Sequence, residues 1–533
     1  MAGLAILIGI YSFLIFGLGL AGKLEVVKAV GWIGLIGMFF LIFSTGYGYR
    51  KKIIKEFQEI IKNKVSLLFF GLLVWSIIIN FVGALGPEIA FDSLWYHLTI
   101  PKIYLTENRI FYIPGGLFYY SAMPKLTEML YLVSLVFSKG GELAKLIHFS
   151  FGLFSATALF ILTRRYLKTK QALITTVLFY TTLIVGWEST AGYIDLARTF
   201  FEIVAIDLFL QWSEKYHIDN HWRSKSLLIE SAVVTGLAIS TKLIAFSSLF
   251  IFLILVFLRT KRPKLSFIYF VCTLGIVSPW LVFSIISTGN PIFPIFSGIL
   301  DTYHQIPKLS LVKIGTDFWQ LLYHPVDLIS PVFLIFTPLV VFHLLKNKTQ
   351  PVIKWVSFYL LLAFSFWYFT PRTGGSRFIL PYLPILAFLF VYVMNDLESF
   401  YKKIFIGVII FSAIINLGCR AVANYKFLKV VAKTQSKQDF LVRNLKFSNG
   451  DFFDQNQDIK KIVGSDLVLI AGSHNLFYAD FPFVHESYAK KETKFSYVLT
   501  QNEEVNTKYG ALKNIYTNQT TNVKLYLYGD SVK

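Results

Sequence analysis

The sequence predicts an all-α polytopic membrane protein with a small C-terminal α/β domain. Of its 533 residues 55% are hydrophobic, and the mean hydropathy of +0.59 is too high for a water-soluble chain of this length. Apolar runs of ~17–25 residues, each long enough to cross the hydrocarbon core, recur along most of the chain. These runs are continuous rather than alternating, which disfavours a β-barrel.

We expect about thirteen membrane spans. The first apolar run, Ala2 to Ala21, has no basic region before it and no clear small-residue cleavage site after it, so it is interpreted as a retained span. The predicted spans are 2–21, 29–48, 65–85, 142–163, 171–187, 195–212, 227–241, 243–258, 265–287, 329–345, 355–369, 378–394 and 404–419.

Basic residues in the short loops predict the orientation. The formal net charge of +20 is therefore interpreted as a topology signal, and no nucleic-acid partner is expected. With these loops on the cytoplasmic side, the N-terminus is inside the cell and the C-terminal domain outside the plasma membrane. The residues concerned are Arg50, Lys51, Lys52, Lys55, Lys62, Lys64, Arg164, Arg165, Lys168, Lys170, Lys215, Arg223, Lys225, Arg259, Lys261, Arg262, Lys264, Lys346, Lys348 and Lys354.

Three regions are expected along the chain. Residues 1–64 form two N-terminal spans and a basic loop, 65–419 form a transmembrane core with outer loops 86–141 and 288–328, and 420–533 form the outer domain. Leu126 to Phe137 is predicted to be a juxtamembrane helix lying at the membrane interface. The outer domain contains three strand-like pieces, namely Asp466 to Ala471, Phe495 to Thr500 and Val523 to Gly529.

The first candidate functional residue is Asp92, which closely follows a span. A carboxylate there can act as a general base toward a sugar or lipid hydroxyl. The alternative is that Asp92 caps the helix that follows, since Asp is a preferred N-cap. Tyr96, His97 and Lys102 are neighbours that favour a functional role and are candidate substrate-positioning residues.

Asp195 is the second candidate, in a short outer turn on the same predicted side as Asp92. The alternative is an ion pair with Arg198, three residues further along a helix. Glu202 lies inside the predicted span that follows, and a carboxylate at that depth is by default a functional hypothesis.

Basic residues on the outer side suggest a phosphate site. Arg372 and Arg377 oppose the positive-inside rule, so topology does not explain them. An arginine fork suits a phosphate, and Lys242, between two short apolar segments, is similarly placed. The alternative is that these side chains extend to lipid headgroups.

No metal or cofactor is predicted. The histidines show no metal-ligand spacing, and Cys272 and Cys419 both fall in predicted spans. A divalent ion held by Asp92 and Asp195 would have only a thin set of ligands.

Taken in order, these features resemble the GT-C glycosyltransferases, nearest to bacterial dolichyl-phosphate-mannose-protein mannosyltransferase-like and lipid A sugar-transferase enzymes. The features are Asp92 in the first large outer loop, a juxtamembrane helix, Asp195 in a short outer turn, an outer loop and a late proline motif. The loop reads Gly289-Asn290-Pro291-Ile292-Phe293-Pro294, and the late motif reads Arg377-Phe378-Ile379-Leu380-Pro381-Tyr382-Leu383-Pro384. Two departures are a single acid at Asp92, where protein mannosyltransferases carry an acidic pair, and two extra spans before the core.

The resemblance implies a polyprenyl-phosphate-linked sugar donor and a lipid, glycan or protein acceptor, with single-step inverting transfer. Asp92 would be the base, Asp195 would orient the acceptor or Asp92, and Arg377, with Arg372 or Lys242, would bind the donor phosphate. A transporter or flippase, or a ligase of lipid-linked saccharides, is the alternative. A transporter should place its polar groups near the middle of the membrane, whereas the groups here are predicted to gather on the outer side.

Overall fold

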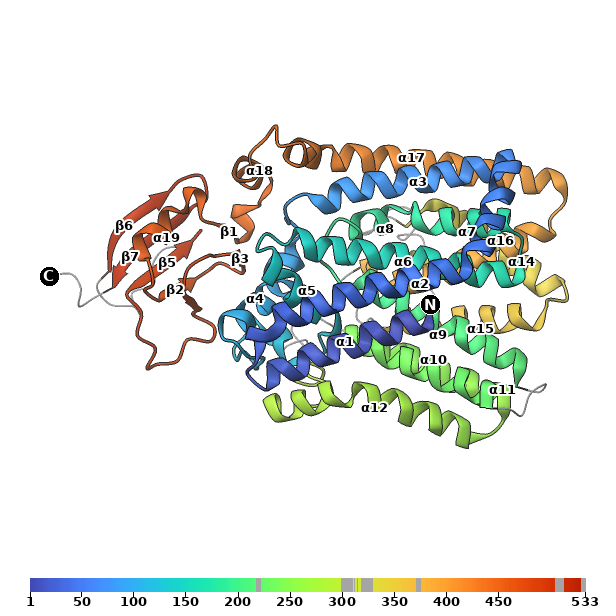
Figure 1. Ribbon diagram of the computed structural model, residues 1–533, viewed down its shortest axis with the longest axis horizontal. Coiled ribbons are helices and arrows are strands. Elements are labelled where there is room, and N and C mark those ends of the chain that lie inside the picture. Colours follow the sequence, from blue (N-terminus) through green and yellow to red (C-terminus); the bar gives the residue numbers. More distant parts are fainter. Residues whose placement is uncertain are drawn as a thin grey trace.

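The computed structural model consists of a long helical bundle with a small sheet at one end (Figure 1). The structure describes residues 1–216, 222–298, 310, 312–313, 315–317, 329–370, 375–503 and 512–528. In Figure 1 the bundle helices run along the long axis of the molecule, and the sheet lies beyond the end of the bundle that contains α4 and α5.

Apart from α4 and α5, the bundle contains fourteen described helices of different lengths. Within the described residues, eight helices are long and apolar enough to cross a membrane, so the chain is a multi-pass membrane protein as predicted. The remaining predicted spans stay predictions. The helices are α1 (Ala2–Leu20), α2 (Val27–Lys62), α3 (Lys64–Leu85), α6 (Glu142–Tyr166), α7 (Thr169–Tyr180), α8 (Leu183–Glu188), α9 (Asp195–Lys215), α10 (Trp222–Thr241), α11 (Phe246–Thr260), α12 (Pro263–Thr288), α14 (Pro331–Lys346), α15 (Pro351–Phe369), α16 (Leu383–Asp396) and α17 (Ser399–Val431).

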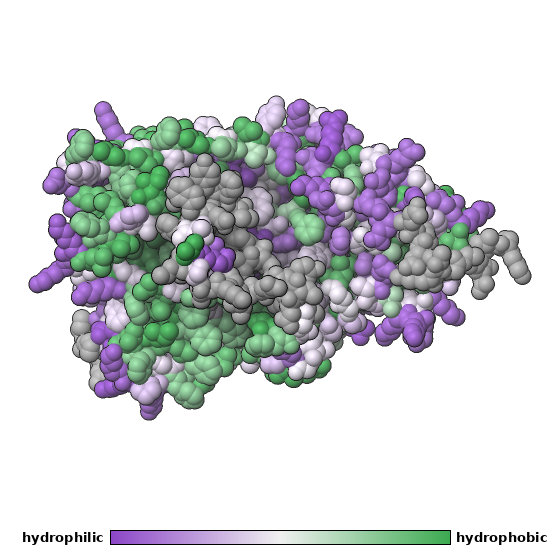
Figure 2. All heavy atoms as spheres, turned by 180° about the vertical axis from the view of Figure 1, so that it is seen from behind, coloured by the Kyte–Doolittle hydropathy of each residue, from purple (hydrophilic) through white to green (hydrophobic). Residues whose placement is uncertain are grey.

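The surface of the bundle is apolar. Large side chains such as Phe40, Trp75 and Phe411 are 62–69% exposed, which would be costly in water and is expected against lipid. Figure 2 shows hydrophobic side chains gathered over the bundle, with hydrophilic ones at its far end and over the C-terminal region. This distribution matches a membrane belt flanked by two polar ends.

Helix α9 lies in the centre of the bundle. It packs against α6 and α10, and its residues are buried on all sides, including Phe200, Phe201 and Phe209. Such burial makes α9 a rigid element. Its first residue, Asp195, is therefore held in a fixed position, beside the loop after α3, whose Glu88 carboxylate accepts the Gly192 N–H.

The loop after α3, for which we keep the name first outer loop from its predicted side, is folded into short helices at the end of the bundle nearer the sheet (Figure 1). They are the π-helix η2 (Ser93–His97), α4 (Thr99–Thr106), the 3₁₀ turn η3 (Tyr119–Ala122) and α5 (Leu126–Phe137). Helix α5 has the bounds predicted for the juxtamembrane helix and is buried against α1, α4 and α6. A π-helical turn is rare and is frequent at functional sites, and this one directly follows Asp92.

The C-terminal region contains a five-stranded mixed sheet of order β4-β2-β5-β7-β6. Strand β2 pairs in parallel with β4 and β5, whereas β7 is antiparallel to β5 and β6. A separate parallel pair joins β1 to β3. The elements are α18 (Lys437–Asn444), β1 (Asp451–Phe453), α19 (Asp458–Val463), β2 (Val468–Ala471), β3 (Asn475–Tyr478), β4 (Phe483–His485), β5 (Tyr497–Gln501), β6 (Leu512–Asn518) and β7 (Val523–Tyr528). The three predicted strands are β2, β5 and β7, the middle of the sheet.

The C-terminal region is docked on the first outer loop. The Tyr478 hydroxyl donates to the Glu88 carbonyl oxygen at 2.8 Å. The Lys102 ammonium donates to the Phe477 and Ala479 carbonyl oxygens, at 2.7 and 3.0 Å, and to Asp480 at 2.7 Å. The sheet is thus connected to the loop that contains Asp92.

Candidate active site

Asp92 points its carboxylate at Arg377. Both Nη atoms of Arg377 donate to Asp92 Oδ2 at 3.0 Å, although the two residues are 285 positions apart in the chain. The Asp92 side chain makes no capping hydrogen bond to the helix that follows. The interpretation of Asp92 as an N-cap is therefore wrong, and its partner comes from a distant part of the chain.

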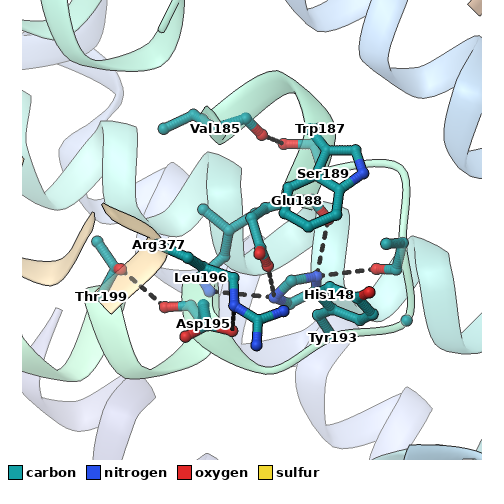
Figure 3. A network of polar contacts seen from close by, with 12 residues as sticks. His148, Val185, Trp187, Glu188, Ser189, Tyr193, Asp195, Leu196, Thr199 and Arg377 are labelled. Carbon is teal, nitrogen blue, oxygen red and sulfur yellow. Dashed lines mark hydrogen bonds and ion pairs between the residues drawn. The ribbon is translucent and has the colours of Figure 1, made fainter. Parts of the chain in front are cut away.

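Asp195 is 1% exposed and faces two cations. The Lys242 ammonium donates to Asp195 Oδ1 at 2.7 Å. Arg377 Nε lies 3.7 Å from Asp195 Oδ2 (Figure 3). The alternative pairing with Arg198 is not found, because Arg198 donates instead to the Tyr382 hydroxyl at 3.0 Å. Asp195 thus belongs to the same charged group as Asp92.

The two cations are held by breaks in the helices. Lys242 lies between α10 and the 3₁₀ turn η4 (Leu243–Ala245), and Arg377 lies in η5 (Gly375–Tyr382). Arg377 also lies 4.9 Å from the centre of the Tyr193 ring, and Lys242 lies 4.8 Å from that of Phe378. Their side chains are only 12% and 16% exposed. Both are buried against carboxylates and rings rather than extended toward headgroups.

These contacts join four residues into what we call the outer charged cluster, named after its predicted side of the membrane. They are Asp92, Asp195, Lys242 and Arg377. Its members come from the loop after α3, the start of α9, the break after α10 and η5. The formal charges balance, with two carboxylates and two cations. Because Lys242 also pairs with Asp195, a bound anion can replace Asp195 on the Arg377 guanidinium without leaving that buried carboxylate unpaired.

Behind the cluster lies His148, which the sequence reasoning missed. Its Nδ1 donates to the carbonyl oxygens of Glu188 and Ala191, both at 2.9 Å, and its Nε2 accepts the Leu196 N–H at 3.0 Å (Figure 3). Two carbonyl oxygens on one nitrogen and an N–H on the other require a neutral imidazole. His148 therefore fixes the turn before α9, and with it the position of Asp195.

Glu188 is a second residue that the sequence analysis did not propose. It is fully buried, and neither carboxylate oxygen has a hydrogen-bond partner among the described residues. Burial, followed by the nearby Asp195 charge, holds the pKa of Glu188 well above its ordinary value. Burial beside Asp195 therefore favours the protonated form of Glu188.

Glu88 joins the first outer loop to the turn before α9. Its Oε1 accepts the N–H groups of Ile89 and Ala90, both at 2.8 Å, and its Oε2 accepts the Gly192 N–H at 2.5 Å. A side chain on Gly192 would approach this carboxylate to about 3.0 Å. These contacts tie the segment just before Asp92 to the turn just before Asp195.

The predicted substrate-positioning residues have different surroundings. Tyr96 is buried and stacks on Tyr120, with ring centres 3.7 Å apart. His97 Nδ1 lies 2.9 Å from Glu128 Oε1, in a pair that is buried. The contacts of Lys102 described above run to the C-terminal region. A role in substrate positioning stays a prediction for all three.

Lys125 is a buried cation that the sequence analysis overlooked. It is 3% exposed, and burial lowers its pKa to about 8, although the nearby Glu128 carboxylate acts in the opposite direction.

Two predictions remain to be placed. Arg372 lies outside the described residues. Among the residues that the structure describes, no group of three or more His, Cys, Asp or Glu side chains is placed to hold a metal ion.

Comparisons with known proteins bear on the fold. A family model described as a domain of unknown function, DUF8201, matches residues 129–323. Among curated proteins, none matches the sequence.

The structure is similar to that of ArnT from Cupriavidus metallidurans bound to undecaprenyl phosphate. The alignment has a TM-score of 0.58 and 12% identity, and it covers 86% of this chain and 98% of that one. The apo form of the same protein gives a TM-score of 0.57, with 12% identity over 87% and 98% of the two chains. The Archaeoglobus fulgidus oligosaccharyltransferase aligns with a TM-score of 0.47 and 14% identity over 80% of this chain and 67% of that one. The similarity to ArnT, over most of both chains, confirms the prediction that this chain has the GT-C glycosyltransferase fold.

Proposed function

We propose that this protein is a membrane glycosyltransferase that moves a sugar from a polyprenyl-phosphate donor to a hydroxyl-bearing acceptor at the membrane surface, with inversion. The observation that supports this most directly is the outer charged cluster. It joins two carboxylates and two cations from four distant parts of the chain, and each group lies 2.7–3.7 Å from at least one group of opposite charge. The acceptor is a lipid, a glycan or a protein.

In the proposed reaction, the acceptor oxygen attacks the anomeric carbon of the sugar. Its proton passes to the Asp92 carboxylate as the new carbon–oxygen bond forms, because a hydroxyl is too weak an acid to lose its proton beforehand. The bond between the anomeric carbon and the phosphate oxygen breaks, and its electron pair stays on the polyprenyl phosphate. One displacement at this carbon inverts its configuration.

The cations have two roles in this proposal. Without a donor, Arg377 neutralises Asp92 and contacts Asp195. When the donor phosphate binds, Arg377 turns from Asp92 to the phosphate. Two phosphate oxygens can then accept parallel hydrogen bonds from the planar guanidinium. This exchange frees Asp92 to accept a proton only when the donor is present, and Lys242 keeps Asp195 neutralised. As charge builds on the leaving phosphate, Arg377 stabilises it.

The position of the cluster suits a lipid-linked donor. Asp195 starts the central helix α9, whose deeper residues are buried among apolar side chains. In this proposal, the polyprenyl chain lies in the hydrocarbon around the bundle while its phosphate reaches Arg377. ArnT, which shares the fold, has been crystallised with undecaprenyl phosphate, and this supports a ligand of the same class here.

The proposal is tested with the full-length protein in liposomes. A panel of polyprenyl-phosphate hexoses and pentoses, radiolabelled in the sugar, is supplied together with a total extract of membrane lipids, glycans and proteins as acceptor. We expect release of polyprenyl phosphate in step with transfer of label, and we expect an Asp92→Asn variant to give neither.

Two controls separate the proposal from its alternatives. The Asp92→Asn protein must keep the elution profile and melting temperature of the wild type, so that loss of transfer is not loss of fold. A flippase would instead move the intact lipid-linked sugar between leaflets without breaking its phosphate bond. Translocation without release of polyprenyl phosphate, for every donor in the panel, would refute the transferase.

A further inference from the structure

At the end of the bundle away from the outer charged cluster lies a cavity of about 730 Å³. It lies between the last turns of α9 and α11 and the first turns of α15, and its walls include Leu210, Leu258, Trp355 and Phe358. Along α9, Asp195 and Ser213 are 18 residues apart, which corresponds to about 27 Å. The cavity is therefore separate from the proposed active site.

Basic groups line this apolar cavity. Its charged lining residues are Arg259, Lys354 and a single carboxylate, Glu214, so the lining has an excess of positive charge. Arg259 is oriented in advance, because its Nε and Nη2 donate to the Ser213 carbonyl oxygen at 3.0 and 2.7 Å. Lys354 is exposed, and its ammonium has no hydrogen-bond or ion-pair partner among the residues that the structure describes.

The depth of these residues matches the headgroup level of a bilayer. Arg259 is the last residue but one of α11, and Lys354 lies in the first turn of α15, and both helices belong to candidate membrane spans. Trp355, half-buried beside Lys354, is of the type that lies at the interface between hydrocarbon and water. A ligand here has its polar group beside two cations and its apolar part against hydrocarbon side chains.

We propose that this cavity binds an anionic phospholipid, with its phosphate between Arg259 and Lys354 and the upper part of an acyl chain against Leu210, Leu258 and Phe358. The volume lies within the ~300–1,000 Å³ usual for ligand sites. A free phosphate would leave the apolar walls in contact with water, and a zwitterionic lipid would leave the excess positive charge unmatched. An anionic lipid satisfies both parts of the lining.

The test uses full-length protein in phosphatidylcholine liposomes that contain increasing fractions of lipid brominated on its acyl chains. Bromine quenches nearby tryptophan. The contribution of Trp355, one of ten tryptophans, is obtained as the difference between wild type and Trp355→Phe. We expect brominated phosphatidylglycerol to quench this contribution at a mole fraction roughly fivefold lower than brominated phosphatidylcholine, since one basic group gives about that preference at a membrane surface.

A second groove provides a matched control. On α3, Lys64, Leu67 and Trp75 line a lipid-exposed groove of about 450 Å³ with a single cation. We expect Lys354→Gln to remove most of the headgroup preference at Trp355, whereas Lys64→Gln leaves it unchanged. Equal quenching by both lipids, or a preference that survives in Lys354→Gln, would overturn the proposal.

An independent measurement covers the case in which Trp355→Phe alters the fold. Native mass spectrometry of the delipidated wild type should show at least one phosphatidylglycerol retained under conditions that strip phosphatidylcholine, and Lys354→Gln should lose it. Inorganic phosphate at millimolar concentration should not displace that lipid. Displacement by phosphate alone would identify an anion site with no lipid specificity and would refute the assignment.

Discussion

Helix α9 carries two buried carboxylates with different surroundings. Asp195, at its start, faces the ammonium of Lys242 and the guanidinium of Arg377. Glu202, two turns deeper, accepts hydrogen bonds from two neutral hydroxyls, Ser248 Oγ at 2.7 Å and Tyr359 Oη at 2.6 Å. The two carboxylates are seven residues apart, which corresponds to about 10 Å along the helix.

The difference lies in what each set of partners can do. A cation that contacts more than one carboxylate can release one of them and bind an incoming anion instead. The surroundings of Asp195 can therefore change during a reaction. Hydroxyls that satisfy a single carboxylate have no such alternative, and each of their bonds helps to hold α9 against α11 and α15. We infer that the outer charged cluster is the reactive region and that the Glu202 group is structural. The predictions below test this contrast.

The largest effect is expected for Asp92→Asn. The amide keeps the size of the side chain but cannot accept a proton, so the transfer rate should fall by about 10²–10⁴-fold. Sugar transfer in liposomes measures this, with the melting temperature as control. Retention of more than a tenth of the wild-type rate at matched protein levels would exclude Asp92 as the base.

The next largest effect is expected for Arg377→Ala. It removes the group that stabilises the leaving phosphate, and transfer should fall by about 10²–10³-fold. Arg377→Lys keeps the charge but loses the planar fork and should recover only part of the rate. The KM for the donor should rise more than the KM for the acceptor in both variants. An equal rise in the two values would contradict the assignment of Arg377 to the donor phosphate.

A smaller effect, on stability rather than rate, is expected for Tyr359→Phe. Loss of the hydroxyl leaves Glu202 Oε1 without its partner in a buried site, which should cost about 1–3 kcal/mol. A lower melting temperature in detergent, with transfer within twofold of the wild type, is the expected result. If transfer fell as far as in Arg377→Ala while the melting temperature held, Glu202 would belong to the reactive region and the contrast would fail.

The smallest effect is expected for Glu188→Gln and depends on pH. Because the pKa of Glu188 is raised in the folded protein, the folded state binds more protons than the unfolded state above the ordinary pKa of Glu, about 4.3. This contribution to stability is complete below that value and is lost as the pH rises through the folded pKa. The stability of the wild type should therefore fall relative to Glu188→Gln as the pH rises. The measurement is the melting temperature of each protein as a function of pH. If the two melting temperatures change in parallel across that range, Glu188 is not held neutral.

Much of the architecture could be read from local patterns. Continuous apolar runs predicted the long helices, and the helix Leu126–Phe137 was predicted with its observed bounds. In the C-terminal sheet, the three predicted strands are the middle ones, β2, β5 and β7, because buried strands have recognisable apolar runs. Four strands were not predicted, namely β4 and β6 at the edges of the sheet and the separate pair β1 and β3. β1, β3 and β4 are only three or four residues long, and in β6 exposed residues interrupt the apolar ones.

The candidate site was predicted in part. The four members of the outer charged cluster were predicted because burying a charge beside an apolar run costs free energy, so such a residue stands out in the sequence. They are Asp92, Asp195, Lys242 and Arg377. His148, Glu188 and Glu88 were missed. Their importance comes from burial and from hydrogen bonds to the turn before α9, and no spacing in the sequence indicates either. One signal was present, namely Glu188 and His148 as polar residues within or beside apolar runs.

The sequence by itself determined which segments are apolar enough to enter a membrane and which charges lie beside them, because both depend on composition over about twenty residues. Only the tertiary structure decided which of those charges meet. Asp92 and Arg377 are 285 residues apart, and Asp195 and Lys242 are 47 apart. Such pairs form when helices pack side by side and bring their ends to one level. That packing depends on the shapes of many side chains at once, whereas each local alternative, a helix cap for Asp92 or an ion pair with Arg198 for Asp195, depends on only a few neighbours.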